Sequence, residues 1–260
     1  MPVSDLSILF GWVSIACWVV VYSPQIYENY SLQSGDGLSV LFVLVWLLGD
    51  ICNLVGAILA NLLPTVILLG VYYTLCDLIL LGQIYYYRWK RSYSEPRREE
   101  QEPLLSTNEQ PTEHTSATMI MIRYACATCF VLAVGVVAWW LSRSNQYMAE
   151  PENPPMAPDW LIQSLGWTSA VSYLGARIPQ IFKNFKTRCE GLSPALFFFA
   201  ILGNATYALS IFAKSMDPDY LMLNASWLAG SILTIFLDVL VMAQIVYYRA
   251  VDHVRMTVFI

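Results

Sequence analysis

The chain has 260 residues, of which 57% are hydrophobic and 13% are charged, and its formal net charge is −5. Its mean hydropathy of +0.52 lies well outside the soluble norm. This composition excludes an ordinary soluble enzyme and a basic nucleic-acid-binding domain, and it indicates a protein whose solvent is lipid.

Apolar windows long enough to cross a bilayer recur along the whole chain. A hydrocarbon core of about 30 Å requires about 20 predominantly apolar residues in helical form. Seven windows bounded by charge or proline meet this requirement, over residues 6–22, 38–60, 64–87, 118–141, 160–178, 192–213 and 222–248. The sequence therefore predicts an all-α membrane protein with seven transmembrane helices.

The two halves of the chain resemble one another. SPQIYENY at residues 23–30 aligns with IPQIFKNF at residues 178–185, and Gly-Leu-Ser follows in both halves. The resulting organisation is a first three-helix repeat (6–88), a flexible cytosolic linker (89–117), a linking transmembrane helix (118–141), a second three-helix repeat (160–249) and a cytosolic tail (250–260). Because each repeat has an odd number of helices, the linking helix gives both repeats the same orientation, as two parallel bundles.

The basic residues predict the orientation of the chain in the membrane, because lysine and arginine are retained on the cytosolic side. Of the 14 basic residues, 12 fall on one predicted face, and only Arg143 and Lys214 fall on the other. We therefore expect the N-terminus in a lumen and the C-terminus in the cytosol.

A Pro-Gln pair ends the first predicted helix of each repeat: Pro24 with Gln25, and Pro179 with Gln180. Proline removes one backbone hydrogen bond of a helix, and a neighbouring glutamine can donate to a freed carbonyl or cross-link two helices. We predict that these four residues form hinges between open and closed states.

Three aspartates fall midway along predicted membrane helices: Asp50, Asp77 and Asp238. Such residues are costly in a bilayer and mark ion or substrate paths. Arg123 and Arg177 are expected near the cytosolic helix ends, so the predicted interior holds carboxylates without fixed cations and favours a positively charged guest. Asp50 is the predicted cation-binding residue, while Asp77 and Asp238 are predicted to couple transport to protons; an interhelical hydrogen bond is the alternative role for the latter two.

Polar and aromatic residues near these positions form a second group of candidates for substrate binding. Asn204 occupies the position of Asp50 in the second repeat. Asn53 lies three residues after Asp50, and Tyr207 lies three residues after Asn204, so the members of each pair are predicted to share a helix face. Together with Asp50, the predicted substrate-binding residues are Asn53, Asn204, Tyr207, Tyr72, Tyr73 and Trp227.

The paired Pro-Gln motifs in a three-plus-one-plus-three layout resemble the PQ-loop family. Within that family, GDICNL at 49–54, SYLGARIPQ at 172–180 and NASWLAGS at 224–231 are similar to the vacuolar and lysosomal cationic amino-acid transporters, above all the fungal vacuolar members. The resemblance covers nearly the whole chain outside the linker, and it implies transport of lysine, arginine or histidine.

The predicted linker contains an acidic dileucine pattern with Glu100, Leu104 and Leu105, which sorting adaptors in the cytosol could bind. This pattern favours a vacuolar or lysosomal membrane. Cys126 and Cys129 have CxxC spacing but lie in an apolar run, where they are interpreted as membrane-facing packing residues. No metal site, cofactor or catalytic constellation is predicted.

These observations converge on a proton-coupled transporter that moves cationic amino acids by alternating access, with the substrate, protons and the bilayer as its partners. Two alternatives remain at this stage. A seven-helix nutrient receptor or sensor would share the layout, and so would a sugar carrier of the SWEET type, although sugars do not require three carboxylates in the membrane.

Overall fold

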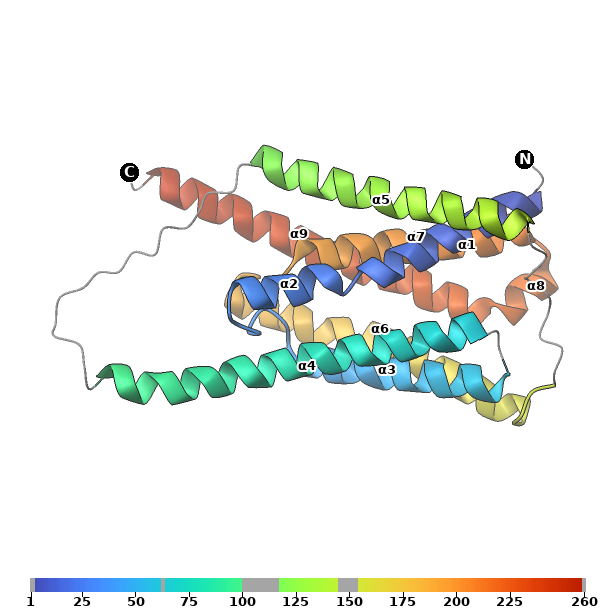
Figure 1. Cartoon of the computed structure of the whole chain (residues 1–260), viewed down its shortest axis with the longest axis horizontal. Coiled ribbons are helices and arrows are strands. Elements are labelled where there is room, and N and C mark those ends of the chain that lie inside the picture. Colours follow the sequence, from blue (N-terminus) through green and yellow to red (C-terminus); the bar gives the residue numbers. More distant parts are fainter. Residues whose placement is uncertain (1–2, 62–63, 100–116, 145–153, 259–260) are drawn as a thin grey trace.

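The computed structural model describes residues 3–61, 64–99, 117–144 and 154–258, and its regular structure within these ranges is helical throughout (Figure 1). The prediction of an all-α protein is confirmed for this part of the chain. The helices are α1 (Val3–Val20), α2 (Ser23–Ser31), α3 (Val40–Leu59), α4 (Pro64–Glu99), α5 (Ala117–Ser144), α6 (Asp159–Thr187), α7 (Pro194–Lys214), α8 (Pro218–Leu223) and α9 (Ala225–Val258).

Five helical segments of the described chain are long and apolar enough to cross a membrane. They are Asp5–Ser31, Val40–Leu59, Val66–Tyr93, Pro194–Lys214 and Trp227–Val251. The two remaining predicted spans are also helical. In α5 the apolar stretch covers Ala125–Leu141. Helix α6 carries many buried polar side chains, and a helix that directs polar groups into a bundle has a lower average hydropathy than one surrounded by lipid.

Two helices extend further than the sequence predicts. Helix α4 continues to Glu99, so the prediction of a flexible linker beginning at residue 89 was wrong for residues 89–99. Helix α9 likewise continues through most of the predicted tail, to Val258. Glutamate, lysine and arginine are good helix formers, so a polar composition ends the apolar window without ending the helix.

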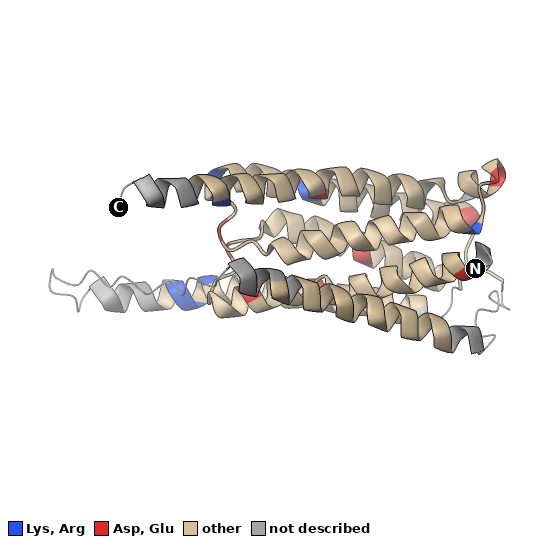
Figure 2. Cartoon of the chain, turned by 90° about the horizontal axis from the view of Figure 1, so that it is seen from above, with Lys and Arg blue, Asp and Glu red and all other residues tan. Residues whose placement is uncertain are grey.

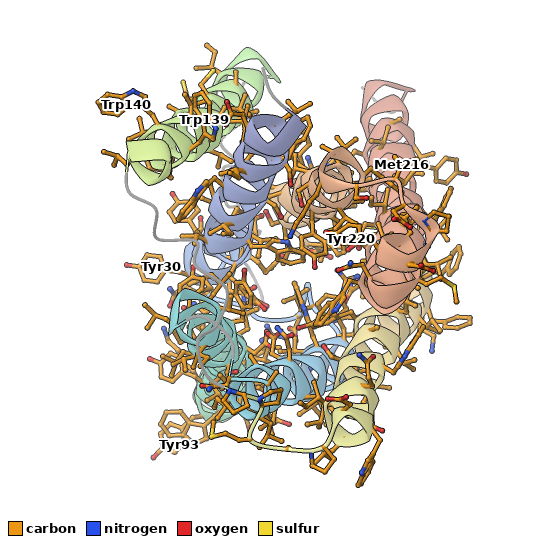
Figure 3. All side chains as sticks on the ribbon, turned by 90° about the vertical axis from the view of Figure 1, so that its right-hand side faces the viewer. Tyr30, Tyr93, Trp139, Trp140, Met216 and Tyr220 are labelled. Atoms are coloured by element: carbon orange, nitrogen blue, oxygen red, sulfur yellow. The ribbon has the colours of Figure 1, made fainter. Side chains whose placement is uncertain are left out.

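Six of the long helices form a ring around a central space. Helix α1 packs on α7, α7 on α9, α9 on α6, α6 on α3, and α3 on α4. Helix α2 follows α1 after a turn at residues 21–22 and contacts α4, which completes the ring. Helix α5 packs on the outside of α1, as the view along the bundle shows (Figure 3).

The outer surface of the bundle carries exposed aromatic side chains. Tyr30, Tyr93 and Trp140 project away from the bundle and are among its exposed aromatic residues (Figure 3). Apolar side chains exposed in this way are compatible with lipid as the surrounding medium. We call the end of the bundle that contains α2 and the C-terminal ends of α6 and α9 the Pro-Gln end (Figure 1).

The two repeats contribute equivalent side chains to the packing at the Pro-Gln end. Three pairs related by the repeat are each at most 2% exposed: Leu38 and Leu192, Phe42 and Leu196, and Ile84 and Ile245. The loop 32–39 connects α2 to α3, and the loop 188–193 connects α6 to α7. We call them the first and the second Gly-Leu-Ser loop. Together with these apolar pairs they close the bundle at this end.

The two Gly-Leu-Ser loops touch at Gly37 and Gly191. A Cβ atom built on Gly37 would lie 1.9 Å from the carbonyl oxygen of Gly191, and Gly191 itself has a φ of +68°. A side chain at residue 37 would therefore force the two loops apart, because the atom that it meets belongs to the backbone.

We expect Gly37→Ala to destabilise the folded protein by about 1–3 kcal/mol, through overpacking of this contact. The measurement is the melting temperature of the purified protein in detergent. Gly82→Ala is the matched control, because Gly82 lies in α4 with no atom within 4 Å of its built Cβ and alanine favours a helix. Equal melting temperatures for Gly37→Ala and the unmodified protein would contradict this account.

Candidate functional site

Gln25 joins the first repeat to the second Gly-Leu-Ser loop. Its Nε2 donates to the carbonyl oxygen of Gly191 at 3.0 Å, and its Oε1 accepts from the backbone N–H of Ser193 at 2.8 Å. The side chain is fully buried. One amide therefore satisfies both a backbone donor and a backbone acceptor of the other repeat, which buried polar groups require.

Gln180 makes the same two bonds in the opposite direction. Its Nε2 donates to the carbonyl oxygen of Gly37 at 3.1 Å, and its Oε1 accepts from the backbone N–H of Ser39 at 2.7 Å. The four bonds cross between the repeats with approximate two-fold symmetry. We call them the glutamine cross-links.

Each glutamine is held in place by a chain of amides that is the same in both repeats. In the first repeat, Gln25 Nε2 also donates to Asn29 Oδ1, and Asn29 Nδ2 donates to Gln83 Oε1 on α4. In the second repeat, Gln180 donates to Asn184, which donates to Gln244 on α9, with donor–acceptor distances of 2.8 and 2.9 Å. The chain fixes the orientation of both amides.

The two prolines have different local effects. Pro24 lies in the first turn of α2, directly after the turn that separates α1 from α2. Pro179 lies inside α6, which continues past it to Thr187. Neither glutamine donates to a carbonyl freed within its own helix, and both cross-link the repeats instead. The hinge role of these four residues stays a prediction.

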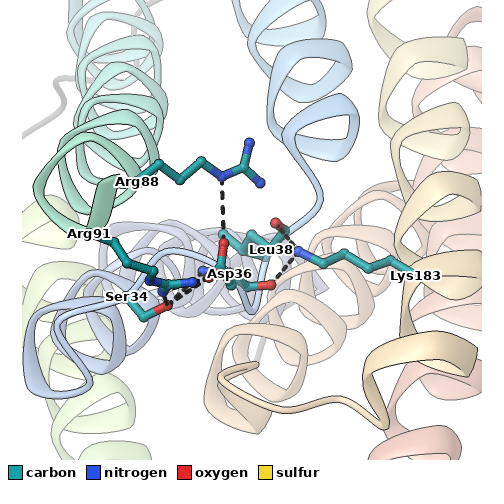
Figure 4. Close-up of polar contacts among 6 residues, drawn as sticks. All are labelled: Ser34, Asp36, Leu38, Arg88, Arg91 and Lys183. Carbon is teal, nitrogen blue, oxygen red and sulfur yellow. Dashed lines mark hydrogen bonds and ion pairs between the residues drawn. The ribbon is translucent and has the colours of Figure 1, made fainter. Parts of the chain in front are cut away.

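A polar cluster fastens the first Gly-Leu-Ser loop from outside the cross-links (Figure 4). Asp36 pairs with Arg91 at 2.7 Å and with Arg88 at 3.5 Å, and the Lys183 ammonium donates to the carbonyl oxygens of Asp36 and Leu38. Partial burial is the largest single influence and raises the pKa of Asp36, but Arg91, Ser34 and Arg88 together outweigh it, so the pKa is lowered. Burial also lowers the pKa of Lys183 to about 8.

This cluster breaks the symmetry of the repeats. Glu28 stands at the position of Lys183 in the first repeat, four residues after proline, and a carboxylate cannot donate to the second loop as the lysine does to the first. The first Gly-Leu-Ser loop is therefore held by a cation of the other repeat, whereas glutamate offers the second loop no such donor.

We predict that Gln25→Leu loosens the second Gly-Leu-Ser loop, since leucine fills the same space but leaves Gly191 and Ser193 without the amide. The measurement is the rate at which a membrane-impermeant maleimide labels Cys189 at neutral pH. Cys189 is 8% exposed and burial raises its pKa to about 11, so labelling of the unmodified protein should be slow. We expect labelling roughly tenfold faster in the variant, because loosening exposes the thiol.

Two controls accompany this measurement. Cys189→Ser identifies the signal that belongs to Cys189, and Gln163→Leu removes an exposed glutamine of α6 near the opposite end of the bundle. Labelling of Cys189 at the same rate in Gln25→Leu and in the unmodified protein would exclude the glutamine as a restraint on this loop.

A cavity of about 710 Å³ occupies the half of the bundle away from the Pro-Gln end. Its inner limit is formed by Tyr22, Trp46 and Arg177, and its lining extends along α3 to Ala60, beside the start of α4. Aromatic residues make up much of the wall: Trp12, Trp18, Trp46, Trp227, Tyr22, Tyr73, Tyr173 and Tyr207. Such a cavity suits a small amphipathic molecule.

Asp50 lies in the cavity wall, midway along α3, and is 2% exposed. Its two oxygens accept hydrogen bonds from one tyrosine of each repeat: Tyr22 at 2.9 Å and Tyr173 at 2.6 Å. A Cβ on Gly49 would lie 2.8 Å from the Tyr173 ring, so glycine before Asp50 permits this approach. The carboxylate is fixed in direction while retaining lone pairs that a guest can use.

Asp77 lies behind Asp50, outside the cavity lining. It is fully buried, and neither of its carboxyl oxygens has a hydrogen-bond partner among the described residues. It lies on α4, which packs on α3, the helix that carries Asp50. Two carboxyl groups in such a site favour sharing a proton over both being ionised.

Asp238 has a fixed cationic partner, which the sequence did not indicate. The Arg177 Nε donates to its Oδ1 at 2.9 Å and a terminal nitrogen donates to its Oδ2 at 3.3 Å, with both side chains at most 1% exposed. The expectation that Arg177 lies at a helix end and that the interior lacks fixed cations was wrong. Helix α6 extends to Thr187, which places Arg177 well inside the bundle.

Most of the second group of predicted residues meet at the cavity. Asn53, Asn204, Tyr207, Tyr73 and Trp227 all line it. The Asn204 side chain is 7% exposed, and its Nδ2 has no hydrogen-bond partner in the described structure. Tyr72 is not part of the lining, because its hydroxyl donates to the carbonyl oxygen of Val19 on α1. Glu100, Leu104 and Leu105 lie outside the described residues, so the sorting signal stays a prediction.

Comparison with known proteins places this geometry in a family. The sequence profile described as the PQ loop repeat matches residues 6–66 and 161–220, which carry the two Pro-Gln pairs and the two Gly-Leu-Ser loops. The chain belongs to the PQ-loop repeat family. Each match falls within one of the two repeats that the cross-links join.

Three curated relatives are similar over nearly the whole chain. A vacuolar lysine transporter of Saccharomyces cerevisiae is 39% identical, over 95% of this chain and 94% of the relative. A vacuolar histidine transporter of the same yeast is 38% identical, over 94% and 92%. The lysosomal amino acid transporter 1 homolog of Homo sapiens is 32% identical, over 94% and 83%. All three relatives are named as transporters of vacuoles or lysosomes, and none as an enzyme.

Proposed function

We propose that this protein exchanges cationic amino acids, namely lysine, arginine or histidine, for protons across a vacuolar or lysosomal membrane by alternating access. The observation that carries the proposal is the cavity with Asp50 in its wall, which lies in the half of the bundle away from a Pro-Gln end that is closed by symmetric loops. The substrates and compartments named for the relatives support it.

We infer a topology of seven membrane spans, formed by α1 with α2, then α3, α4, α5, α6, α7 and α9. In this proposal α6 is a span whose buried polar residues face the interior of the bundle, and α8 is too short to cross a bilayer. Most basic residues lie towards the Pro-Gln end, whereas acidic residues occur at both ends (Figure 2). The Pro-Gln end would thus face the cytosol, with the N-terminus in the lumen, and the cavity would face the lumen.

The charges around the cavity support selection for cations. Asp50, Asp77 and Asp238 contribute three carboxyl groups and Arg177 one guanidinium, and the pair of Arg177 with Asp238 is neutral. If Asp50 and Asp77 share one proton, the site keeps a net charge of −1, which a substrate of charge +1 neutralises. A second proton taken from an acidic lumen would have the same effect, so protons and substrate would compete for one site.

Polar groups with spare bonding capacity can orient the guest. Asn204 has an amide donor without a partner at the cavity, which a substrate oxygen can accept from. Trp227 and Tyr73 offer aromatic faces for a cationic side chain. Access from the Pro-Gln end would require the glutamine cross-links to break, which agrees with the hinge role predicted for Pro24 and Pro179.

The test is uptake of radiolabelled lysine and arginine into proteoliposomes, with and without a pH gradient. We expect saturable uptake that the gradient drives. In Asp50→Asn the rate of uptake should fall roughly tenfold or more, because the charged partner of the cation is removed. Asp77→Asn should retain exchange of lysine for lysine but respond less to the gradient, because Asp50 then lacks the neighbouring carboxyl group that favours its uptake of a proton.

Asp217→Asn is the matched control, since Asp217 is exposed and caps the N-terminus of α8, where asparagine serves equally well. Absence of lysine and arginine flux in sealed, correctly inserted vesicles would overturn the proposal and favour a receptor or sensor. Flux of sugars in place of amino acids would favour a SWEET-type carrier.

A further inference from the structure

Arg177 is one of two charged residues among the described residues that line the cavity, and the other is Asp50. A guanidinium has five N–H donors. Two of its nitrogens each donate once to Asp238, and the third donates to the carbonyl oxygen of Tyr173 at 3.0 Å. Two N–H groups therefore remain on a cation that forms part of the cavity wall.

The plane of the guanidinium is held from the side of α3. Its carbon lies 5.0 Å from the centroid of the Trp46 ring and 5.7 Å from that of Phe42, and Trp46 is itself stacked on Tyr22 at 5.1 Å. Salt bridge and rings together fix a planar fork of donors, which matches the two oxygens of a carboxylate.

The three-helix repeat does not require this ion pair. Tyr22 stands at the position of Arg177 in the first repeat, two residues before proline, and Asp77 corresponds to Asp238. The first repeat buries its equivalent apolar residues just as completely with a tyrosine and a carboxyl group that has no cationic partner. The cation is thus an addition to one repeat, at the position where the cavity ends.

Tyr173 connects Arg177 with Asp50: its carbonyl oxygen accepts from the guanidinium at 3.0 Å, and its hydroxyl donates to the Asp50 carboxylate at 2.6 Å. The cavity therefore presents one cationic and one anionic side chain near each other. This is the complement of the carboxylate and ammonium groups that every free α-amino acid carries on a single carbon.

We propose that Arg177, positioned by Asp238, Trp46 and Phe42, binds the α-carboxylate of the transported amino acid and makes the transporter reject amines that lack it. This inference rests on the proposed function. The substrate then bridges Arg177 and the carboxyl group of Asp50 through its backbone, and its side chain extends into the aromatic part of the cavity, where Trp18 and Trp227 form the wall.

The test compares lysine with cadaverine, its decarboxylated form, as unlabelled competitors of radiolabelled lysine uptake in proteoliposomes. The informative variant combines Arg177→Gln with Asp238→Asn, because removing the arginine alone leaves a buried unpaired carboxylate that could unfold the protein. We expect the double variant to raise the KM for lysine about 10- to 100-fold, as loss of a charge-assisted bidentate contact does. The concentration of cadaverine that halves uptake should stay the same.

The ratio of the cadaverine concentration to the lysine concentration that halves uptake, which we call the preference, should therefore fall towards one in the double variant. Arg177→Lys, which keeps the charge but not the fork, should lie between this variant and the unmodified protein. Arg249→Gln, which removes an exposed arginine at the Pro-Gln end of α9, should leave the preference unchanged. Gel filtration and melting temperature check that each variant is folded.

Three results would overturn this inference while leaving the proposed function intact. The unmodified protein could accept cadaverine as readily as lysine; the double variant could retain both the KM for lysine and the preference; or the preference could be lost in Asn204→Leu and kept in the Arg177 variants, which would assign the carboxylate to Asn204. Absence of any lysine uptake by the unmodified protein would instead overturn the proposed function, and this inference with it.

Discussion

The reciprocal bonds of Gln25 and Gln180 are the constraint on which the rest of the structure depends. In a medium without water every backbone N–H and carbonyl group must find a partner within the protein, and loops between helices have such groups to satisfy. Each glutamine supplies a donor and an acceptor to the Gly-Leu-Ser loop of the other repeat. The loops can therefore be buried against each other, and the bundle is closed at this end.

A nearly symmetric scaffold carries an asymmetric set of charges. The amide chains, the glycine contact and the apolar pairs are equivalent in the two repeats. Arg177 replaces Tyr22, Asp50 replaces Asn204, and Lys183 replaces Glu28. Packing and the hydrogen bonding of the backbone thus depend on the residues that the repeats share. The cavity and its surroundings depend on the residues at which the repeats differ. A guest with an acidic and a basic group cannot be complementary to a symmetric site.

The sequence predicted the repeats, the helical segments, the Pro-Gln pairs and the mid-helix position of Asp50, because hydrophobic length and repeated letters report these features directly. It did not predict that each glutamine bonds to the opposite loop, since partners distant in sequence leave no local pattern. The error at Arg177 came from a helix boundary. Hydropathy ended the helix near residue 178, but α6 continues for ten residues beyond Arg177, about 15 Å at 1.5 Å per residue.

A local signal for this boundary was nevertheless present. Arg177, Gln180 and Asn184 have the i, i+3, i+7 spacing of one helix face, and all three are buried. Gln25 and Asn29 repeat the last two positions of that pattern. Periodicity of polar residues is thus informative inside a membrane bundle, where the polar face of a helix points inward and the apolar face points to lipid.

Opening of the Pro-Gln end has an energetic scale that follows from these contacts. Each of the four cross-repeat hydrogen bonds contributes about 0.5–1.5 kcal/mol, because water replaces part of the interaction when the bond breaks. Breaking all four therefore costs several kcal/mol. Lys183 and Asp36 add contacts to the first loop that Glu28 cannot provide for the second, so the two loops are restrained differently. A ligand shifts such an equilibrium only by its difference in affinity between the two states. Asp50, Asp77, Arg177 and Asp238 lie on α6, which carries Gln180, or on helices that pack against α6 or α2. Neutralising these charges can therefore act directly on the contacts that must break.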